Sequence, residues 1–325
     1  MLTKIDWDSQ IGRRLRLRDL HVFVTVIQRG SMGKAARQLG VSQPAVSEVI
    51  ADLEHALGVR LLDRRPQGVE PTIYGGALLK RSVVVFDELK QSVRDIESLA
   101  NPAAGDVWVG CPESLAFLSS AIIDRLSRRY PDVVVHVVTA QPATLEFREL
   151  RERKVDLLLG RVSTPLADDD VDVEILFKDQ LFVVAGARNR WTRRQKIDLA
   201  ELMNERWLLL PRNNVLSSLI ARAFQARGLG LPQESVSADV HVRIHLLTTG
   251  RFLTILPGSL LQFIAKRWSL RPLPIDLGVH APSLGIVTLK NRTLSPVVQL
   301  FIESAREVAK SIARKSQARG RRESR

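Results

Sequence analysis

Two polar side chains at the start of one amphipathic segment have the chemistry to read the edges of nucleic-acid bases. Gln43 and Ser47 lie four positions apart in residues 43–57, where apolar residues recur every three or four positions. This spacing predicts a helix with both polar side chains on its outer face. A glutamine amide both donates and accepts, so it can make two hydrogen bonds to one adenine in the major groove of DNA.

A shorter helix is expected just before this one, across a tight turn. Ser31 is placed to cap a helix that ends at Gly40, and Ser42 to cap a second helix that ends at Gly58. Pro44 then falls in the first helical turn, where a missing N–H costs little. Two such helices form either an ordinary helical hairpin or a helix-turn-helix, in which the start of the second helix enters the major groove.

Two arginines follow the helix pair, at the predicted tip of a wing. Arg64 and Arg65 lie between short segments, 61–63 and 69–71, that predict the two strands of this wing, and an amphipathic helix over 15–28 would back the pair. A phosphate needs only a positive donor within reach, so these arginines suit contact with a DNA backbone. Plain surface charge is the alternative.

A long helix with an apolar seam is predicted next. Thr72 can cap a helix that extends to about residue 99, and 101–105 forms a Pro and Gly hinge. Its apolar residues follow the alternation of three and four that makes a coiled-coil seam. One small winged domain cannot bury such a seam, so the pattern predicts a partner helix. The seam residues are Leu79, Phe86, Leu89, Val93 and Ile96.

From residue 106 onward, near-continuous apolar strands alternate with helices. This pattern predicts a parallel sheet covered on both faces, and a polar interval at 165–170 divides it into two units. The expected strands span 107–111, 133–139, 156–160, 173–176, 181–185, 207–210, 252–256 and 284–289. The expected helices span 115–129, 145–153, 216–227, 240–249 and 295–312.

Two α/β units of this size would meet in a cleft, and ligands collect outside the carboxyl ends of parallel strands. Ser114 follows the first strand at a predicted helix start, where it could hold a polar group of a ligand, act only as a cap, or do both. Glu113 beside it favours hydroxyls or an amine over a simple carboxylate. The candidate effector contacts are Glu113, Ser114, Thr139, Gln141, Arg161, Asn213, Asn214 and His241.

Catalytic and metal-binding motifs are missing from the sequence. No histidine is paired with a nucleophile in a recognisable motif, and there is no Gly-rich phosphate loop. His241 and His245 have the spacing of two metal ligands, but no third ligand completes the set, so we expect neither a metal nor a cofactor. Cys111 is the only cysteine, which excludes an internal disulfide, and we expect a buried, inert thiol.

The charge of the chain favours an anionic partner but is unevenly distributed. The formal net charge is +13, yet residues 1–75 carry only eleven basic against eight acidic side chains. Residues 310–325 carry seven against one and show no apolar periodicity, which predicts a disordered tail. Such a tail either attracts DNA nonspecifically or has no role.

No apolar run has the length of a membrane span and no secretion signal is recognisable, so we expect a cytoplasmic protein.

One stretch resembles a known family closely. GSMGKAARQLGVSQPAVSEVIADLEHALGVRLLDRR (30–65), followed by PTIYGG (71–76), is similar to the N-terminal domain of LysR-type transcriptional regulators. TTGRFLTILP (248–257) is similar to the family's second-lobe signature. The resemblance covers roughly residues 15–305. The family usually has a basic residue where this chain has Glu48 and an aromatic where it has Leu62, so no DNA contact is carried over to Glu48.

The resemblance implies an α/β fold with an all-α winged helix-turn-helix domain at its N-terminus. This domain would span 15–73 and bind double-stranded DNA through Ser31, Lys34, Ser42, Gln43, Pro44, Ala45, Ser47, Arg64 and Arg65. A dimerisation helix and hinge over 74–105 would lead to an effector-binding domain over 106–309 that resembles type 2 periplasmic binding proteins. Its lobe 1 would comprise about 106–165 and 280–309, and its lobe 2 about 166–279, before the tail of 310–325.

The implied function is regulation of transcription in response to a small-molecule metabolite. The resemblance implies a homodimer or a dimer of dimers, contact with RNA polymerase if the protein activates, and no membrane. The sequence resembles members of the family that control sugar uptake or aromatic breakdown, which implies target genes of one of these kinds. An α/β enzyme or a solute-binding protein is the alternative, which the missing catalytic residues and secretion signal disfavour. The sequence leaves open the effector, the target genes, and whether the protein activates or represses.

Overall fold

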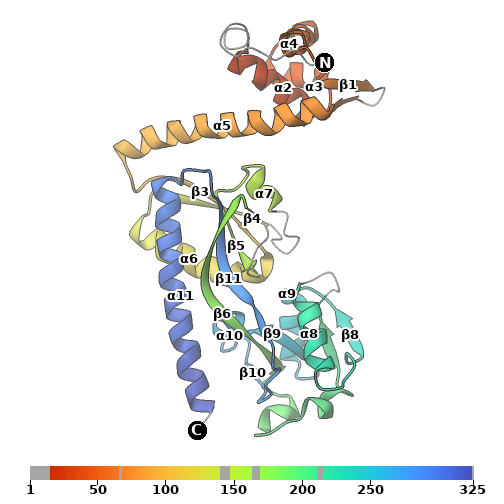
Figure 1. Cartoon of the computed structure of the whole chain (residues 1–325). Helices are drawn as coiled ribbons and strands as arrows, with labels where there is room; N and C mark the ends of the chain where they lie inside the picture. The colour runs from red at the N-terminus through yellow and green to blue at the C-terminus, as the bar shows by residue number, and fades with distance from the viewer. Residues whose placement is uncertain (1–14, 66–67, 140–146, 163–168, 211–214, 324–325) are drawn as a thin grey trace. The chain divides into compact units, whose positions relative to one another are not determined.

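The computed structural model describes residues 15–65, 68–139, 147–162, 169–210 and 215–323 (Figure 1). Gln141, Asn213 and Asn214 therefore lie outside the described residues. The chain divides into two compact units, Met1–Val93 and Arg94–Arg325. Within the described ranges, no helix combines the length and the apolar character needed to cross a membrane.

The first unit is a helical domain with a two-stranded wing. It contains α2 (Leu17–Arg29), α3 (Met32–Leu39), α4 (Gln43–Leu57), β1 (Leu62–Arg65), β2 (Gly68–Pro71) and most of α5 (Ile73–Ala100). The apolar sides of the first three helices meet in one core, whose largest fully buried members include Phe23, Ile50 and Leu53. This arrangement confirms the predicted helix pair with its supporting helix.

The turns between these helices form where the sequence predicts them. Gly40 and Gly58 adopt left-handed φ values of 68° and 67° and end α3 and α4, a conformation that glycine adopts without steric cost. The Ser42 hydroxyl accepts a hydrogen bond from the Ala45 N–H at 3.3 Å, as expected of a cap. Ser31 stands at the N-cap position of α3, but its side chain makes no capping bond.

The wing is an antiparallel hairpin in which Leu62 pairs with Pro71 and Arg65 with Gly68. Arg64 and Arg65 lie within β1 rather than at the tip, because the strand extends two residues beyond the predicted end. One carboxylate oxygen of Glu54 on α4 accepts the N–H groups of Leu61 and Leu62, at 2.7 and 3.1 Å. These bonds fix the base of the wing to the helix before it.

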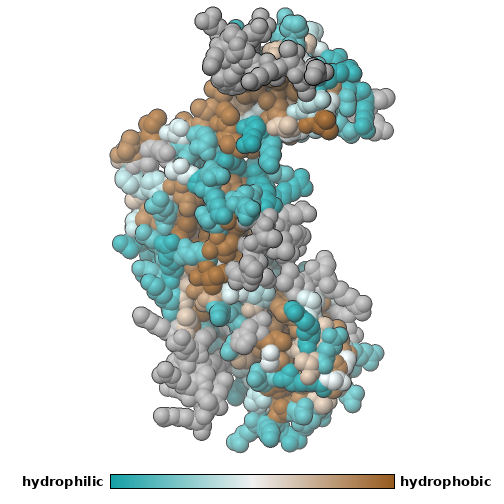
Figure 2. All heavy atoms as spheres, viewed as in Figure 1, coloured by the Kyte–Doolittle hydropathy of each residue, from teal (hydrophilic) through white to brown (hydrophobic). Residues whose placement is uncertain are grey.

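Helix α5 has the predicted start and length. The Thr72 hydroxyl accepts from the Gly75 N–H at 3.1 Å and caps the helix, which runs for 28 residues. The predicted seam divides into two parts, because Leu79 and Phe86 pack against the core of the helical domain. Leu89, Val93 and Ile96 are exposed, and Figure 2 shows apolar side chains gathered along this part of α5.

The second unit contains two lobes built on one strand path. Its sheet has the order β4-β3-β5-β11-β6-β9-β7-β8, with β10 paired to β6. Its strands are β3 (Gly105–Cys111), β4 (Val133–Thr139), β5 (Leu157–Val162), β6 (Val171–Gly186), β7 (Trp207–Leu209), β8 (Glu234–Ser237), β9 (Leu253–Pro257), β10 (Leu270–Pro272) and β11 (His280–Leu289). Its helices are α6 (Ala116–Arg129), α7 (Arg148–Arg151), α8 (Val215–Gln225), α9 (Val240–Thr248), α10 (Gly258–Ile264) and α11 (Pro296–Glu323), with short 3-10 turns η2 (Glu113–Leu115), η4 (Arg190–Arg193) and η5 (Leu199–Leu202).

Both lobes have helices on each face of their sheet. In lobe 1, α6 and α11 pack side by side on one face, while Phe147 and α7 cover the other (Figure 1). In lobe 2, α8 packs on one face, with Trp207 and Phe224 in edge-to-face contact at 5.7 Å, and α9 and α10 cover the other face. The apolar strands are thus buried on both faces, as their sequences predict.

Two long strands carry the chain between the lobes. Strand β6 pairs with β11 from Val171 to Gln180 and with β9 from Leu181 to Ala185, so it crosses from lobe 1 to lobe 2 without a break. The sequence predicts two strands here, 173–176 and 181–185, because Lys178, Asp179 and Gln180 interrupt the apolar run. The prediction was wrong because the Asp179 side chain, although polar, is buried and bonded at the crossing.

Two helices differ most from their predicted extents, and β8, α10, β10 and the 3-10 turns η4 and η5 were not predicted. Helix α7 has a single turn, because Phe147 before it adopts a left-handed φ of 41°. Helix α11 continues to Glu323 instead of ending near 312, so the predicted disordered tail is helical there. Its Ala, Lys, Arg and Gln residues all favour helix. The short elements β8, α10 and β10 have too few residues to show a period.

Candidate DNA-binding and effector-binding sites

The predicted DNA-contacting residues lie at the N-terminal ends of α3 and α4 and in β1. Lys34, Ser42, Gln43 and Pro44 are exposed, while Ser31, Ala45 and Ser47 are half-buried. The Gln43 side chain lies beside α3, because a Cβ built on Gly33 would come within 3.2 Å of its amide oxygen. The start of α4 is therefore open to solvent and supported from behind by α3.

The wing meets the outer face of α4. The Arg64 guanidinium donates to the Ser47 hydroxyl at 3.2 Å, which brings a cation of β1 next to a candidate base-reading residue. Arg65 instead pairs with Glu70 of β2 at 3.1 Å, and both side chains are well exposed. Such exposed pairs are weak, so this pairing leaves Arg65 available to an anion.

Glu113 and Ser114 lie between the first strand and first helix of lobe 1. Both are exposed in the 3-10 turn η2, which directly precedes α6. Ser114 is not the N-cap of α6, because Leu115 holds that position. The hydroxyl of Ser114 is thus left at the surface instead of closing the first turn of the helix.

Two candidate effector contacts from opposite lobes, Glu113 and His241, lie next to each other. His241 on α9 of lobe 2 approaches Glu113 of lobe 1, with 3.4 Å between the imidazole Nε2 and a carboxylate oxygen. Both side chains are about half exposed, so the contact stands at the surface where the lobes face each other. Thr139 is exposed at the end of β4. The structure therefore brings together Glu113, Ser114 and His241.

Arg161 is engaged by partners inside the fold. Its side chain is 12% exposed and binds the Asp179 carboxylate at 2.7 Å and the Pro282 carbonyl at 3.2 Å. The sequence suggested an effector contact because Arg161 follows a predicted strand end. Strand β5 instead continues to Val162, so Arg161 lies within the sheet. We assign it to the junction of the lobes.

The two histidines with metal-ligand spacing turn to different partners. His241 faces Glu113, whereas the His245 ring packs edge-on against Trp268 at 4.7 Å. Across the described ranges, no three His, Cys, Asp or Glu side chains are grouped as a metal ion would require.

Cys111 at the end of β3 is buried and neutral. Its sulfur lies 3.0 Å from the Ser119 hydroxyl of α6. Burial raises the pKa of the Cys111 thiol to about 11, although the Ser119 hydrogen bond opposes this shift. The thiol lies close to Ser114 in sequence but does not extend the candidate effector site.

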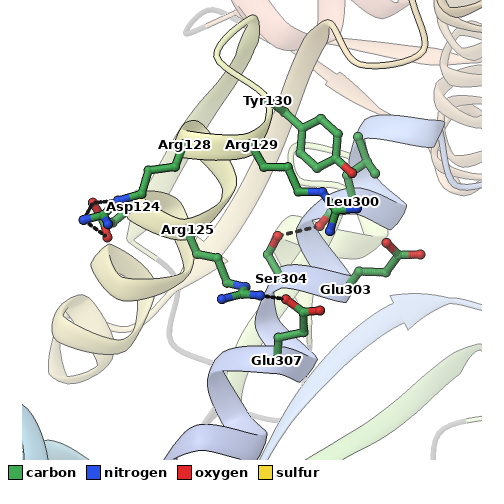
Figure 3. A pocket seen from close by; sticks show the side chains of 9 residues that line it. All are labelled: Asp124, Arg125, Arg128, Arg129, Tyr130, Leu300, Glu303, Ser304 and Glu307. Atoms are coloured by element: carbon green, nitrogen blue, oxygen red, sulfur yellow. Dashed lines mark hydrogen bonds and ion pairs between the residues drawn. The ribbon is translucent and has the colours of Figure 1, made fainter.

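A cavity of about 380 Å³ opens between α6 and α11, which the sequence did not indicate (Figure 3). Arg125 forms an ion pair with Glu307 across it, Arg128 pairs with Asp124 along α6, and the Ser304 hydroxyl donates to the Leu300 carbonyl. The charges of the cavity largely satisfy one another. A run of arginines at a helix end is too common a signal to have predicted it.

A winged helix-turn-helix domain joined to a two-lobed α/β domain defines a class of protein: DNA-binding regulators that respond to a ligand. Residues 17–76 match the family described as "Bacterial regulatory helix-turn-helix protein, lysR family", and residues 100–310 match the family described as "LysR substrate binding domain". The chain belongs to the LysR family of transcriptional regulators. The predicted family, α/β fold class and effector-dependent regulation of transcription are thereby confirmed.

The sequences of relatives agree with this assignment, and a solved structure shows a similar fold. The chain is 30% identical over 290 residues to the HTH-type transcriptional regulator TdcA of Escherichia coli K12, covering 89% of this chain and 91% of TdcA. It is 26% identical to the regulator GbpR of Azospirillum brasilense, covering 93% and 89%. A full-length OxyR variant from Pseudomonas aeruginosa has a similar fold, with a TM-score of 0.64, 22% identity, and 90% and 98% coverage.

Proposed function

We propose that this regulator reads operator bases through Gln43 and Ser47 and holds phosphates through Lys34, Arg64 and Arg65. The Ser47 to Arg64 hydrogen bond supports this division, because it sets a wing cation beside the outer face of α4. Ser31, Ser42, Pro44 and Ala45 complete the surface that faces the DNA. Glu48 is exposed on the same helix, and its charge disfavours a nearby phosphate.

The effector binds between the lobes, against Glu113, Ser114 and His241. The observation that carries this proposal is the contact of Glu113 with His241, in which polar side chains of opposite lobes approach within 3.4 Å. A ligand held by both sides changes the free energy of the closed arrangement relative to the open one. An effector with a hydroxyl or amine would bind the Glu113 carboxylate, whereas a bare carboxylate would be repelled.

The functional unit is a homodimer, or a dimer of dimers, formed through α5. The exposed side chains of Leu89, Val93 and Ile96 support this proposal, because covering three apolar residues of one helix face with a second copy stabilises the dimer.

The protein acts on cytoplasmic DNA without catalysing a reaction, and contacts RNA polymerase if it activates. Control of sugar-uptake or aromatic-breakdown genes stays a prediction.

A thermal-shift screen followed by footprinting tests the effector site. A metabolite at one hundred times its Kd stabilises the folded state by about 2.7 kcal/mol and raises Tm. Once one is found, Ser114→Met should abolish both the Tm shift and the footprint change, because the longer side chain fills the site. DNA affinity without effector should be retained.

The matched control is Ser127→Met, an exposed serine at the far end of α6. This variant should respond to the effector as wild type does. If Ser114→Met protein still shows the wild-type footprint change, the effector binds elsewhere.

A further inference from the structure

A buried polar cluster stands where the chain crosses between the lobes. Asp179 lies at the changeover on β6, because Gln180 is the last residue paired with β11 and Leu181 the first paired with β9. The Asp179 carboxylate accepts from the Ser259 and Gln180 N–H groups, the Ser259 hydroxyl and the Arg161 guanidinium, at 2.5 to 3.0 Å. Four donors on two oxygens satisfy a buried carboxylate fully.

The second crossing strand is held by the same arginine. The pairing of β11 with β6 shifts register on either side of Leu284, and Pro282 has no partner in that ladder. The Pro282 carbonyl accepts from Arg161 Nη1, while Arg161 Nη2 binds Asp179 on β6. One planar guanidinium therefore joins both crossing strands. Its rigid fork makes this geometry specific to arginine.

The cluster also reaches the helix that packs at the junction. Ser259 is the second residue of α10, and Asp179 accepts both its N–H and its hydroxyl, so the aspartate caps a helix from a distant strand. Farther along α10, Phe263 packs against the cores of both lobes. A shift of Asp179 would therefore move α10 with it.

We infer that Arg161, Asp179 and Ser259 are positioning residues for the regulatory response: they form a hinge pin that sets the resting angle between the lobes. The inference rests on the proposed binding of an effector between the lobes, since only then does this angle control DNA binding. An ion pair buried in one lobe would stabilise that lobe alone. This cluster instead joins β5 of lobe 1, both crossing strands and α10, so its loss changes the relation of the lobes.

The test measures the distance between lobes in the full-length protein without any effector. Spin labels at Ser127→Cys in lobe 1 and Ala226→Cys in lobe 2, both exposed positions, report the angle by pulsed dipolar spectroscopy. The background is Cys111→Ala, and labelled chains are assembled with excess unlabelled protein so that only distances within one chain are measured. Arg161→Met should shift the mean distance by more than about 2 Å, the scale of domain rearrangement.

Two further variants separate positioning from simple charge neutralisation. Arg161→Lys keeps a cation beside Asp179 but loses the fork, so we expect a shift like that of Arg161→Met with a Tm closer to wild type. Arg306→Met is the control, because Arg306 also pairs with a carboxylate of β6, that of Glu174, but entirely within lobe 1. This control should leave the distance unchanged.

If folded Arg161→Met protein has the wild-type distance between the two spin labels, the hinge-pin proposal is wrong. The same holds if Arg161→Lys protein has the wild-type distance. If Arg161→Met does not fold, Ser259→Ala removes one hydroxyl while keeping the Arg161 to Asp179 pair, and an unchanged distance in that variant overturns it too. Failure of the effector proposal looks different: the distances shift as expected, but Ser114→Met still responds to effector.

Discussion

Burial decides the chemistry of the only cysteine. Because the pKa of the Cys111 thiol is raised to about 11, only about one thiol in a thousand is ionised at pH 8. The thiolate is the reactive form, so we expect alkylation of native protein by iodoacetamide to be at least about a hundredfold slower than after unfolding in urea. The native rate should rise about tenfold per pH unit until the pH approaches the pKa. Mass spectrometry of quenched samples measures both rates.

A cysteine introduced at exposed Ser127 provides the control and should react at the rate of an unfolded thiol. Fast labelling of Cys111 in native protein at pH 8 would contradict the assignment of an inert thiol.

At the DNA surface, base reading and phosphate contact predict different mutant phenotypes. Gln43→Ala should cost about 1 to 3 kcal/mol on operators that keep the contacted base and little on others. Arg64→Ala should weaken binding about equally on all sequences and make the salt dependence shallower. Titrations of both variants on a panel of single-base operator variants distinguish the two roles. Equal losses from both substitutions on every operator would reverse the assignment.

Single residues were predictable where the signal is local. Ser42, Gly40 and Gly58 act in turns defined by their immediate neighbours, and the structure places all three as expected. The role of Arg161 was not predictable, because its partners Asp179, Pro282 and Ser259 lie 18 to 121 residues away in sequence. The spacing of residues along the chain does not indicate which distant side chains lie close together at the junction of the lobes.

Helix α5 shows what periodicity can and cannot predict. The alternation of three and four gave the correct helix, but it could not show that Phe86 faces the helical domain while Val93 is exposed. Both positions have the same local pattern. Only the packing of α5 on the neighbouring core separates them.

The exposed part of the seam allows dimerisation to be tested without disturbing the domain core. Leu89→Asp combined with Val93→Asp should give folded monomers, because burying two carboxylates in an apolar seam costs several kcal/mol. Phe86 is left intact, since its loss would disturb the domain core. Lys90→Asp, which changes the net charge by the same amount, should remain dimeric. Sedimentation velocity measures the outcome, and a folded dimer in the double variant would remove this stripe from the interface.

At the scale of the whole molecule, much of the positive charge lies at the end of α11. Deleting residues 314–325 removes six Lys or Arg and one Glu. We expect weaker binding to nonspecific DNA and a shallower salt dependence, with sequence preference unchanged, because phosphate contacts carry no sequence information. Titration of wild type and deletion at several salt concentrations measures this change.

Substituting the same six basic residues by Gln keeps the length of the chain. This variant should show the same weaker nonspecific binding and the same shallower salt dependence as the deletion. An unchanged salt dependence in both proteins would show that the segment does not contact DNA.

The alternation of strands and helices predicted two α/β lobes, but not how the chain connects them. Nothing in the composition of 280–289 indicates that this last strand inserts between β5 and β6. An edge strand and a central strand can have the same apolar pattern when both faces are covered. The return of the chain to lobe 1 came from the family resemblance alone.

The central place of β11 also determines the order in which the protein can be completed during synthesis. Domains generally fold from the N-terminus as the chain emerges, so the helical domain can form while most of the sensor is still to be made. Lobe 1 cannot, because its sheet has a vacant central position until residue 289 has left the ribosome. Until then β5 and β6 are both unprotected edges, the kind of surface that pairs with other chains. The sheet of lobe 1 can therefore be completed only after the residues of lobe 2 have been synthesised, much later than the helical domain.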